Sequence, residues 1–493
     1  MLGYACSMSG KSTSTTHYRT CNLCEAMCGV QVEIQGKSIV SVRGDAQDVF
    51  SRGHVCPKAT ALKDLYDDPD RLRHPVRRVG DRWEQISWDE AFDEVADRLH
   101  QIQQDYGRDA VGVYLGNPNA HNFGTMVYGP PLLRALRTKN RFSATSCDQL
   151  PLMMASYFMF GHQLLFPVPD VGRTDYMVII GGNPLASNGS IMAAPGIKKR
   201  LEAISRRGGK LLVIDPRRSE TARIADEHVF IQPGTDAVFL LGLLHEVCAA
   251  GVDLGRLADH VQNLDRVLEV ANLYPAAKTE TVTGISADTV KRIARELRAA
   301  PTAAIYGRMG ASTQEFGGLT MWLINVLNAV TANLDEPGGS MFSSPAIDIL
   351  GKAGGFGAGR GSFGRWRSRV RGLPEFGGEL PSSTMAEEIL TEGEGQIRAM
   401  ITVAGNPVLS TPNGGQLDEA YASLDFAVHS TKRFTRRTLN RSSLSTGVRF
   451  VDGVVIVCGR QWITALRPQL GLDPGGLSGL TRIRHRDDHG DVV

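Results

Sequence analysis

The sequence contains 493 residues, enough for several domains, of which 42% are hydrophobic and 22% are charged. The formal net charge of +2 excludes the strongly basic balance of nucleic-acid-binding and membrane-surface proteins, so we expect neither partner. Eight cysteines are too few for a disulfide framework in this length of chain and favour a reducing compartment. Residues 1–18 lack the apolar core of an export signal, and the apolar run 237–250 is too short to cross a membrane. We therefore expect a cytoplasmic protein without membrane insertion.

Three closely spaced cysteines near the N-terminus, Cys21, Cys24 and Cys28, are followed by a fourth at Cys56. Three near cysteines plus a distant one are a common thiolate set for a [4Fe–4S] cluster. Structural zinc sites usually pair two short Cys-x-x-Cys knuckles, whereas Cys56 stands alone. The spacing therefore favours a cluster, with zinc as the alternative. The alternating residues 30–42 predict a small β-hairpin, which such a cluster would stabilise.

After residue 62 the predicted elements alternate between helices and strands. Ser87 to Glu90 is a capping-box sequence and opens a helix that ends at Gly107. Short apolar runs typical of buried strands recur at 111–115, 176–181, 210–215, 303–306 and 399–404. Helical patterns occur between or after them at 197–207, 236–249, 288–300 and 316–333. This alternation predicts βαβ units and an α/β fold with mostly parallel sheets.

One strand-to-loop pattern occurs more than once. Strands predicted to end near residues 181 and 404 both run into Gly-Asn-Pro, at Asn183 and at Asn406, and a weaker copy lies at Asn117. Gly-Asn-Pro also suits an ordinary turn after a strand. Ligands of open α/β sheets bind beyond the carboxyl ends of strands, however, so two matching loops predict two related half-sites for a ligand with two similar ends.

Two other loops have side chains suited to a nucleotide. Asp215 and Arg217 follow a predicted strand directly, and Gly234 and Asp236 open a predicted helix. A carboxylate can accept two hydrogen bonds from a guanine, and an arginine can bind a phosphate. Taken singly, such residues are more often caps or turns. No Gly-x-Gly-x-x-Gly follows a strand as a dinucleotide fingerprint requires.

In combination, these motifs resemble the molybdopterin-dependent oxidoreductases of the dimethyl sulfoxide reductase superfamily, which includes formate dehydrogenases and periplasmic-type nitrate reductases. The resemblance implies a small iron–sulfur β domain and two interleaved α/β domains, each holding one of two molybdopterin guanine dinucleotides around molybdenum or tungsten. It implies these divisions: a tail, 1–16; the cluster domain, 17–62; one α/β domain, 63–115 with 335–428; the other, 116–334; and a last segment, 429–493. It implies cofactor binding by Asn183, Pro184, Asp215, Arg217, Gly234, Asp236, Gly307, Gly310 and Asn406.

Two further residues gain a role through the resemblance. Lys58 matches a family lysine between the cluster and the pterin; otherwise it is a solvated surface charge. Cys147 lies where the family presents the protein ligand of the metal, and a thiolate is a soft ligand; otherwise it is a packed thiol. Asp148 stands where the formate dehydrogenases compared have a histidine, which puts formate as the substrate in doubt.

The C-terminal segment departs from the family pattern. From Thr431 onward the chain has eleven Lys and Arg, five Asp and no Glu. We expect residues 429–493 to be an atypical basic tail caused by a disrupted reading frame, with the family's C-terminal β-barrel missing or disrupted. The predicted function is formate-dehydrogenase-like or oxyanion-reductase-like oxidoreduction with a redox partner protein. The alternatives are a truncated, non-catalytic iron–sulfur or cofactor-binding remnant and a zinc-stabilised binding protein.

Overall fold

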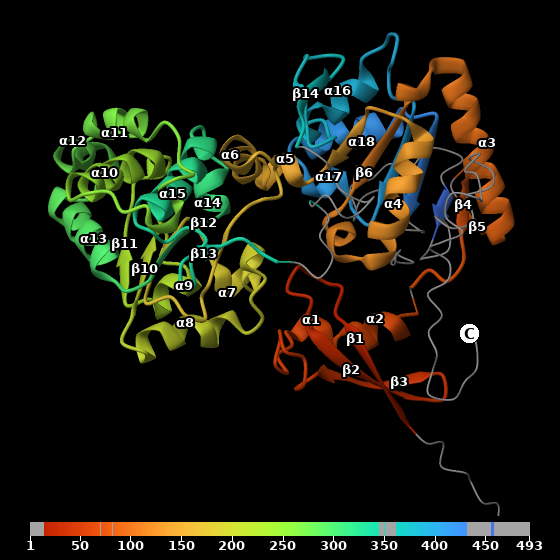
Figure 1. The fold of residues 1–493 in the computed structure, drawn as a ribbon. Helices are drawn as coiled ribbons and strands as arrows, with labels where there is room; N and C mark the ends of the chain where they lie inside the picture. Colours follow the sequence, from red (N-terminus) through yellow and green to blue (C-terminus); the bar gives the residue numbers. More distant parts are fainter. Residues whose placement is uncertain are drawn as a thin grey trace, which may run out of the picture. The chain divides into compact units, whose positions relative to one another are not determined.

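The computed structural model describes residues 14–69, 71–80, 82–344, 350, 361–430 and 455–457. The chain divides into two compact units, each built from two stretches of sequence. Unit 1 combines Met1–Asp67 with Thr145–Phe363, and unit 2 combines Asp68–Ala144 with Gly364–Val493. Both contain a sheet with parallel strands (Figure 1), so the predicted α/β class is confirmed. None of the described helices is long and apolar enough to span a membrane.

Unit 1 begins with a three-stranded antiparallel sheet in the order β1-β2-β3. Its strands and the two short helices after it are β1 (Thr15–Thr20), β2 (Gly29–Gln35), β3 (Ser38–Gly44), α1 (Pro57–Thr60) and α2 (Leu62–Asp67). The small core of this region contains Cys21, Ala26, Cys28, Val30, Val42 and Ala59. Because two of these six buried residues are cysteines, the cysteine loop is part of what holds the sheet together.

The main sheet of unit 1 is parallel, in the order β11-β10-β9-β12. Its strands are β9 (Tyr176–Ile180), β10 (Lys210–Ile214), β11 (Glu227–Val229) and β12 (Ala303–Gly307). Strands β9 and β12 are apolar along their length because helices cover both faces of the sheet. One face packs on α10 (Asp236–Ala249), α13 (Ala287–Ala299) and α15 (Gly317–Val330). The other packs on α8 (Ile197–Arg206), as Figure 1 shows.

The remaining elements of unit 1 are mostly short. The helices are α5 (Thr145–Asp148), α6 (Leu150–Phe160), α7 (Pro184–Ser187), α9 (Glu220–Ile224), α11 (Leu264–Asn272), α12 (Ala276–Thr283) and α14 (Met309–Ser312). A two-stranded antiparallel pair is formed by β8 (Val168–Pro169) and β13 (Ser340–Met341). Helices α7, α9 and α14 directly follow or flank strand ends, so they shape the loops at the carboxyl edge of the main sheet.

Unit 2 contains a mixed seven-stranded sheet in the order β5-β4-β18-β17-β16-β6-β7. The strands are β4 (Val76–Val79), β5 (Arg82–Gln85), β6 (Val111–Leu115), β7 (Arg141–Ser143), β16 (Ala399–Val403), β17 (Phe426–Ser430) and β18 (Val455–Val457). The run from β18 to β7 is parallel, and β4 and β5 add an antiparallel edge. The segment Val455–Val457 of the expected tail is thus a strand of this sheet, and most of residues 429–493 lie outside the described residues.

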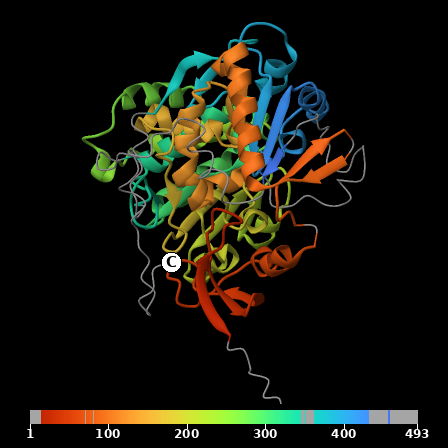
Figure 2. The same cartoon turned by 90° about the vertical axis from the view of Figure 1, so that its right-hand side faces the viewer.

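Helices cover the sheet of unit 2 on both faces. They are α3 (Trp88–Tyr106), α4 (Phe123–Leu136), α16 (Met385–Leu390), α17 (Pro407–Ser410) and α18 (Gly414–Ala422). The predicted capping box of α3 is confirmed: the Ser87 side chain accepts from the Glu90 N–H, and the Glu90 carboxylate accepts from the Ser87 N–H at 2.8 Å. Figure 2 shows α3 running along the sheet, where Phe92, Val95 and Leu99 join its core.

The boundaries between the units differ from those predicted. Residues 116–144 belong to unit 2 rather than to a domain that spans 116–334, because β7 pairs with β6 and α4 buries Leu132 and Leu136 in the same core. Residues 335–363 belong to unit 1, where β13 pairs with β8. Both boundaries depend on pairing between strands that are distant in sequence, and such pairing cannot be predicted from composition.

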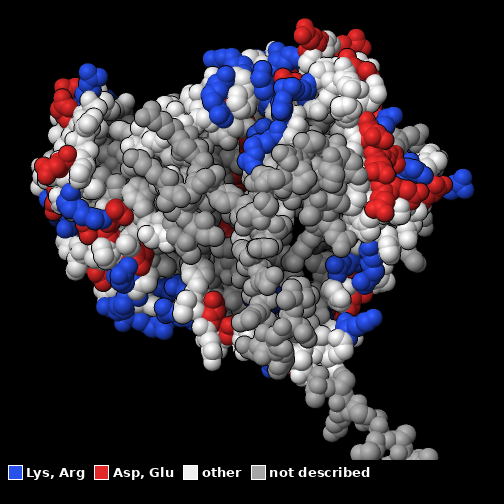
Figure 3. All heavy atoms as spheres, turned by 45° about the vertical axis from the view of Figure 1, so that its right-hand side comes forward, with Lys and Arg blue, Asp and Glu red and all other residues white. Residues whose placement is uncertain are grey.

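A hairpin of unit 2 is rich in arginine. Its strands are β14 (Phe363–Arg367) and β15 (Pro374–Phe376). Figure 3 shows Lys and Arg gathered over it at the top of the molecule. Arg365 binds the buried Glu375 at 2.9 Å, and Arg371 binds Glu387 at 2.6 Å. Arg365 and Arg371 are therefore paired with glutamates of the same unit, whereas Arg367 donates to the Gly372 carbonyl at 2.8 Å.

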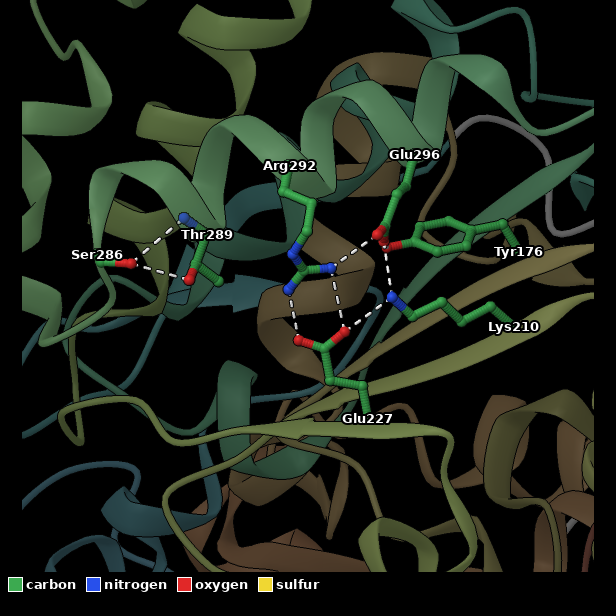
Figure 4. A network of polar contacts seen from close by, with 7 residues as sticks. All are labelled: Tyr176, Lys210, Glu227, Ser286, Thr289, Arg292 and Glu296. Carbon is green, nitrogen blue, oxygen red and sulfur yellow. Dashed lines mark hydrogen bonds and ion pairs between the residues drawn. The ribbon is translucent and has the colours of Figure 1, made fainter.

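A polar network ties the amino ends of the main strands of unit 1 to α13 (Figure 4). Lys210 lies between Glu227 and Glu296, at 2.8 and 2.9 Å, and Arg292 contacts the same two carboxylates. The Tyr176 hydroxyl donates to Glu296 at 2.8 Å. Burial raises the pKa of both carboxyls, but hydrogen bonds from Lys210 and Arg292 outweigh it and leave each pKa below its ordinary value.

We predict that Lys210→Met lowers the free energy of unfolding by about 1–3 kcal/mol at pH 7, because it removes a charged donor from two carboxylates. A carboxyl whose pKa is lowered stabilises the fold above the ordinary value of 4.5, and this is lost as the pH falls through the lowered pKa. The difference in the free energy of unfolding between wild type and Lys210→Met should therefore become smaller as the pH falls below 4.5. Urea unfolding followed by circular dichroism measures both effects.

The matched control is Lys198→Met, which removes an exposed pair with Glu202 at 3.9 Å. Such a pair contributes about 0.5 kcal/mol or less. Equal losses in the two variants, or a difference that does not depend on pH, would show that the network in Figure 4 does not stabilise the fold.

Candidate functional site

The four N-terminal cysteines lie in loops that flank the small sheet. Cys21 follows β1 and Cys28 precedes β2, and the Cys21 N–H donates to the Cys28 carbonyl at 2.8 Å. Met27 turns the loop back with a φ of 41°, and its N–H donates to the Cys24 carbonyl at 3.2 Å. Cys56 precedes α1 as its N-cap residue. Strand pairing and this turn therefore bring Cys21, Cys24 and Cys28 together, and α1, which contacts β3, holds Cys56 on the same small sheet.

Electrostatics show that the four thiols lie together. Burial raises the pKa of Cys28, the neighbouring Cys21, Cys24 and Cys56 also raise it, and together they bring it to about 11. Burial also raises the pKa of Cys21, and the nearby Lys58 opposes this. All four cysteines are free of disulfides. Buried thiols that disfavour one another's charge suit a bound cation, because metal coordination deprotonates thiols outright.

The arrangement of the thiols also bears on the kind of metal group. Within the described ranges, no group of three or more His, Cys, Asp or Glu is arranged to hold a single metal ion. A four-iron cluster does not need such a group, since each cysteine binds a different iron and the thiolates lie apart around the cluster.

A second candidate site lies at the carboxyl edge of the main sheet of unit 1. From β9 the chain moves to β10 and β11 on one side, whereas β12 lies on the other. The switch point is therefore between β9 and β12, where open α/β sheets bind ligands. The loops at this edge are 181–183 after β9, 215–219 after β10, 230–235 after β11 and 308–316 after β12, the last of which includes the short helix α14. Of the predicted cofactor-binding residues, these loops contain Asn183, Asp215, Arg217, Gly234 and Gly310.

The loops after β9 and β12 approach backbone to backbone. Arg308 N–H donates to the Ile180 carbonyl at 3.2 Å, and Gly310 N–H donates to the Gly181 carbonyl at 2.9 Å. Gly181 has a φ of 56°, and a Cβ there would lie 2.4 Å from the Ala311 nitrogen. A Cβ on Gly310 would lie 2.8 Å from the Gly181 oxygen. Only glycine permits this approach at both positions, so Gly310 shapes the switch point.

Asn183 ties the loop after β9 to the one after β10. Its Nδ2 donates to Glu220 at 2.6 Å, and its Oδ1 accepts from the Thr221 hydroxyl at 2.8 Å and from the Thr221 N–H. Pro184 is buried as the first residue of α7. The Asn183 side chain is therefore engaged at both ends, and ligand contact by this residue stays a prediction.

Two carboxylates lie near each other at the same edge. Asp215 accepts from the Arg217 N–H at 2.7 Å, and the exposed Arg217 side chain lies 3.8 Å from Glu220. Asp236 opens α10, is buried, and accepts from Gln314 of the β12 loop at 2.8 Å. Burial raises the pKa of Asp236, and the charge of Asp215 adds to this. Gln314, not among the predicted site residues, thus links α10 to the switch point.

Two of the predicted glycines occupy different surroundings. Gly234 has a φ of 81°, with nothing within 4 Å of a Cβ placed on it, so it leaves the start of α10 open. Gly307 ends β12, and a Cβ there would lie 2.4 Å from Ile324 and 2.8 Å from Met321. Gly307 therefore makes room for α15 on the sheet, which is a packing role.

The predicted metal-ligand segment lies on the short helix α5, beside the β12 loop. Cys147 is half-buried, and the Asp148 carbonyl accepts from the Ser312 hydroxyl at 3.2 Å. Burial raises the pKa of Asp148, and the charge of Arg308 opposes this. Both Ser312 and Arg308 belong to the connection after β12. Cys147 and Asp148 are thus near the switch point of unit 1, although 160 residues separate them in sequence from that loop.

Unit 2 has a switch point of its own, between β6 and β16, because β6 leads to β7 on one side and β16 to β17 on the other. Asn406 follows β16 as the N-cap of α17 and accepts from the Leu409 N–H at 3.3 Å. The weak third copy of the loop pattern, at Asn117, follows β6. Asn119 in that copy donates to the carbonyls of Gly116 and Val403, at 2.8 Å each. The copy at Asn183 therefore follows a strand of the unit 1 sheet, whereas the copies at Asn406 and Asn117 follow strands of the unit 2 sheet.

Comparisons with known proteins support a common interpretation of both sites. A model described as molybdopterin oxidoreductase matches residues 71–442. A second model, described as the molybdopterin oxidoreductase Fe4S4 domain, matches residues 15–67. The first covers most of the chain, and the second covers the stretch with the four cysteines.

Relatives and a solved structure agree with these models. "Probable oxidoreductase YyaE" of Bacillus subtilis is 25% identical over 429 residues, which are 84% of this chain and 59% of that protein. "Formate dehydrogenase H" of Escherichia coli is 27% identical over 64% of this chain and 44% of its own length. Acetylene hydratase from Pelobacter acetylenicus shares the fold with a TM-score of 0.73 at 19% identity, over 92% of this chain and 69% of that one. The chain spans about half the length of the curated relatives it matches.

We predict that Gly181→Ala disrupts the first switch point. The added Cβ is strained by the positive φ and also clashes with the backbone of Ala311. We expect the clash to lower the free energy of unfolding by about 1–3 kcal/mol beyond the loss caused by the strained φ. The control is Gly208→Ala, whose φ is 86° but whose Cβ would meet nothing within 4 Å. Thermal unfolding of both variants tests this. Equal destabilisation would mean that the loops can move apart without cost.

Proposed function

The chain belongs to the molybdopterin oxidoreductase family, and we propose that it exchanges electrons with a small substrate at molybdenum or tungsten held by two molybdopterin guanine dinucleotides. One observation carries this proposal. Each unit has one switch point in its sheet, and each switch point has a Gly-Asn-Pro loop, at Asn183 and at Asn406. Two similar half-sites fit a cofactor with two similar ends.

The residues of unit 1 fit a guanine nucleotide. Asp215 and Asp236 offer carboxylate oxygens at one edge, and a guanine presents ring and amino N–H donors to such acceptors. Arg217 is exposed beside them, where it can bind a phosphate. Gly234 leaves space at the start of α10. We assign these residues to one dinucleotide and Asn406 to the other.

When bound, the cofactor supplies two-electron exchange with the substrate, and the protein supplies orientation and exclusion of water. Cys147 is the proposed protein ligand of the metal, since a thiolate is a soft donor. Asp148 is the competing ligand because it is the adjacent carboxylate. Arg308 lies close enough to lower the pKa of Asp148, so it holds a positive charge where an anionic substrate can approach.

The cysteine loop is the proposed binding site of a [4Fe–4S] cluster that passes electrons singly. Lys58 is exposed and acts electrostatically on Cys21. A positive charge beside a cluster favours its reduced, more negative state, and net charge is one of the factors that set cluster potential. We therefore propose that Lys58 raises the reduction potential of the cluster and that a redox partner protein exchanges electrons with it.

The proposed substrate is formate or a small oxyanion. Relatives include proteins named formate dehydrogenase, nitrate reductase and arsenate respiratory reductase. A non-catalytic remnant and a zinc-stabilised binding protein are the competing proposals. The buried Asp148 close to the positive charge of Arg308 supports an enzyme over a remnant, because carboxyls with a raised pKa gather at functional sites.

We predict that the chain purified without oxygen contains about four iron atoms, together with molybdenum or tungsten. Cys24→Ser should lower the iron content by a quarter or more and bleach the visible absorption, because one thiolate is lost. The matched control, Cys248→Ser, replaces a thiol on α10 and should leave the iron unchanged. Metal analysis and absorption spectra give the result. Zinc without iron would refute the cluster, and iron without molybdenum or tungsten would support the remnant.

The metal ligand is tested separately. We predict that Cys147→Ala alters the electron paramagnetic resonance spectrum of the molybdenum or tungsten while the pterin content stays at the wild-type level. Asp148→Asn should leave the spectrum unchanged, because the amide keeps the volume of the side chain. The reverse result would transfer the ligand role from Cys147 to Asp148.

A further inference from the structure

An exposed apolar tip lies in the loop between β3 and α1, which leads directly to Cys56. Two neighbouring side chains form the tip: Val49 is 87% exposed and Phe50 is 41% exposed. The next residue, Ser51, is buried, and its hydroxyl accepts from the Gly29 N–H at 3.1 Å. Gly29 directly follows the loop of three cysteines. The apolar tip is therefore bonded to the backbone on one side of the proposed cluster and continues into the cysteine on the other.

Hydrogen bonds within this loop hold the apolar tip in place. Asp48 accepts from the Ser51 N–H at 2.6 Å and from the Ser51 hydroxyl at 2.5 Å, so its carboxylate is engaged inside the loop. The Gly53 N–H donates to the Asp45 carbonyl at 2.8 Å. A Cβ on Gly44 would lie 2.1 Å from the Gly53 oxygen, so the two ends of the loop are in close contact. A tip that is already ordered loses little conformational entropy when a partner binds.

Helix α8 provides a strong excess of positive charge in the same unit. Residues 197–207 contain five Lys and Arg and one Glu, whereas the whole chain has a net charge of +2. Lys198 and Arg206 are exposed and share that glutamate, Glu202, at 3.9 and 3.7 Å. Lys199 is exposed as well. One carboxylate does not neutralise these cations, so α8 presents a net positive charge to solution.

The basic helix and the apolar tip lie side by side. Arg200 of α8 donates to the Phe50 carbonyl at 3.1 Å. Burial lowers the pKa of Arg200, and the charge of Arg52, which is an exposed residue of the loop, also lowers it. The two arginines are therefore close to each other where the loop meets the helix. The apolar tip thus has positive charge beside it on both the loop and α8.

We propose that Val49, Phe50 and the exposed cations of α8 form the docking surface for a small acidic electron-carrier protein. The apolar tip occupies the centre of the interface and the cations its rim, as is usual for protein interfaces. Complementary charges orient the carrier and raise the rate of encounter. One electron passes from the reduced carrier to the oxidised cluster, or from the reduced cluster to the oxidised carrier. The proposal rests on the proposed function of the cluster and adds to it the docking surface and charge of the redox partner.

The test uses two probe proteins of opposite charge with the full chain purified without oxygen. The acidic probe is a [2Fe–2S] ferredoxin, and the basic probe is a cytochrome c. We expect the double variant Lys198→Glu/Lys199→Glu to weaken ferredoxin binding, and to slow electron transfer from reduced ferredoxin to the cluster, by about tenfold or more at low ionic strength. Electron transfer from the reduced cluster to cytochrome c should become faster in the same variant, which a misfolded chain would not show.

Val49→Ser tests the apolar tip separately, because it changes no charge. It should weaken ferredoxin binding by about threefold to tenfold through faster dissociation, since truncation of a central contact acts on the dissociation rate. The dependence of the association rate on salt should stay that of wild type. Biosensor binding at several salt concentrations gives both rates, and stopped-flow absorption gives the electron-transfer rates.

The matched control is Lys291→Glu/Arg295→Glu, which reverses two exposed charges on α13, on the other face of the main sheet of unit 1. It should leave ferredoxin binding within about twofold of wild type. Equal weakening in the two double variants overturns the proposal, and so does wild-type binding by Lys198→Glu/Lys199→Glu or no binding of ferredoxin by wild type. Dissociation of an oligomer in the α8 variant would instead assign the surface to a second copy of the chain. Absence of iron refutes the proposed cluster but leaves the binding measurements valid, so the two failures are distinguishable.

Discussion

The close approach of loop backbones at two switch points is the constraint on which the candidate site depends. The carboxyl ends of parallel strands lie at the same edge of a sheet, so loops that are far apart in sequence lie close together there. In unit 1 the β9 and β12 loops bond to each other through Gly181 and Gly310. In unit 2 the β6 and β16 loops meet at Gly116 and Ala404. Each sheet thereby prepares one ligand edge from main-chain geometry, and the side chains only complete it.

Much of this fold follows from the sequence because its signals are local. The apolar runs at 176–181 and 210–215 are buried strands, since a strand covered on both faces cannot alternate. The capping box at Ser87 starts its helix because both of its bonds are made within four residues. The cysteine spacing and the Gly-Asn-Pro loops can also be recognised in the sequence, because each is a short motif of specific residue types at fixed spacing.

The rest depends on contacts that no local pattern shows. Residues 116–144 join unit 2 through strand pairing, which the sequence does not reveal at that distance. The sequence motif predicts that Asn183 binds a ligand, yet its side-chain amide is hydrogen-bonded to Glu220 and Thr221 of the same unit. Gly307 provides room for Ile324, which is visible only once the strand and α15 are packed. Val49 and Phe50 carry no distinctive sequence signal, and their exposure is visible only once the loop that contains them is folded.

The arginine-rich hairpin of unit 2 has a consequence for how this protein meets charged molecules. Figure 3 gives it a basic appearance, yet Arg365, Arg369 and Arg371 each contact a glutamate, and the side chains of Glu375 and Glu388 are inaccessible to solvent. Opposite charges a few ångströms apart cancel at distances beyond the Debye length of about 8 Å. The hairpin thus presents little more than the charge of Arg367, which donates to the Gly372 carbonyl rather than to a glutamate. Long-range attraction of polyanions should be weak at this surface, and raising the ionic strength should change its encounters very little.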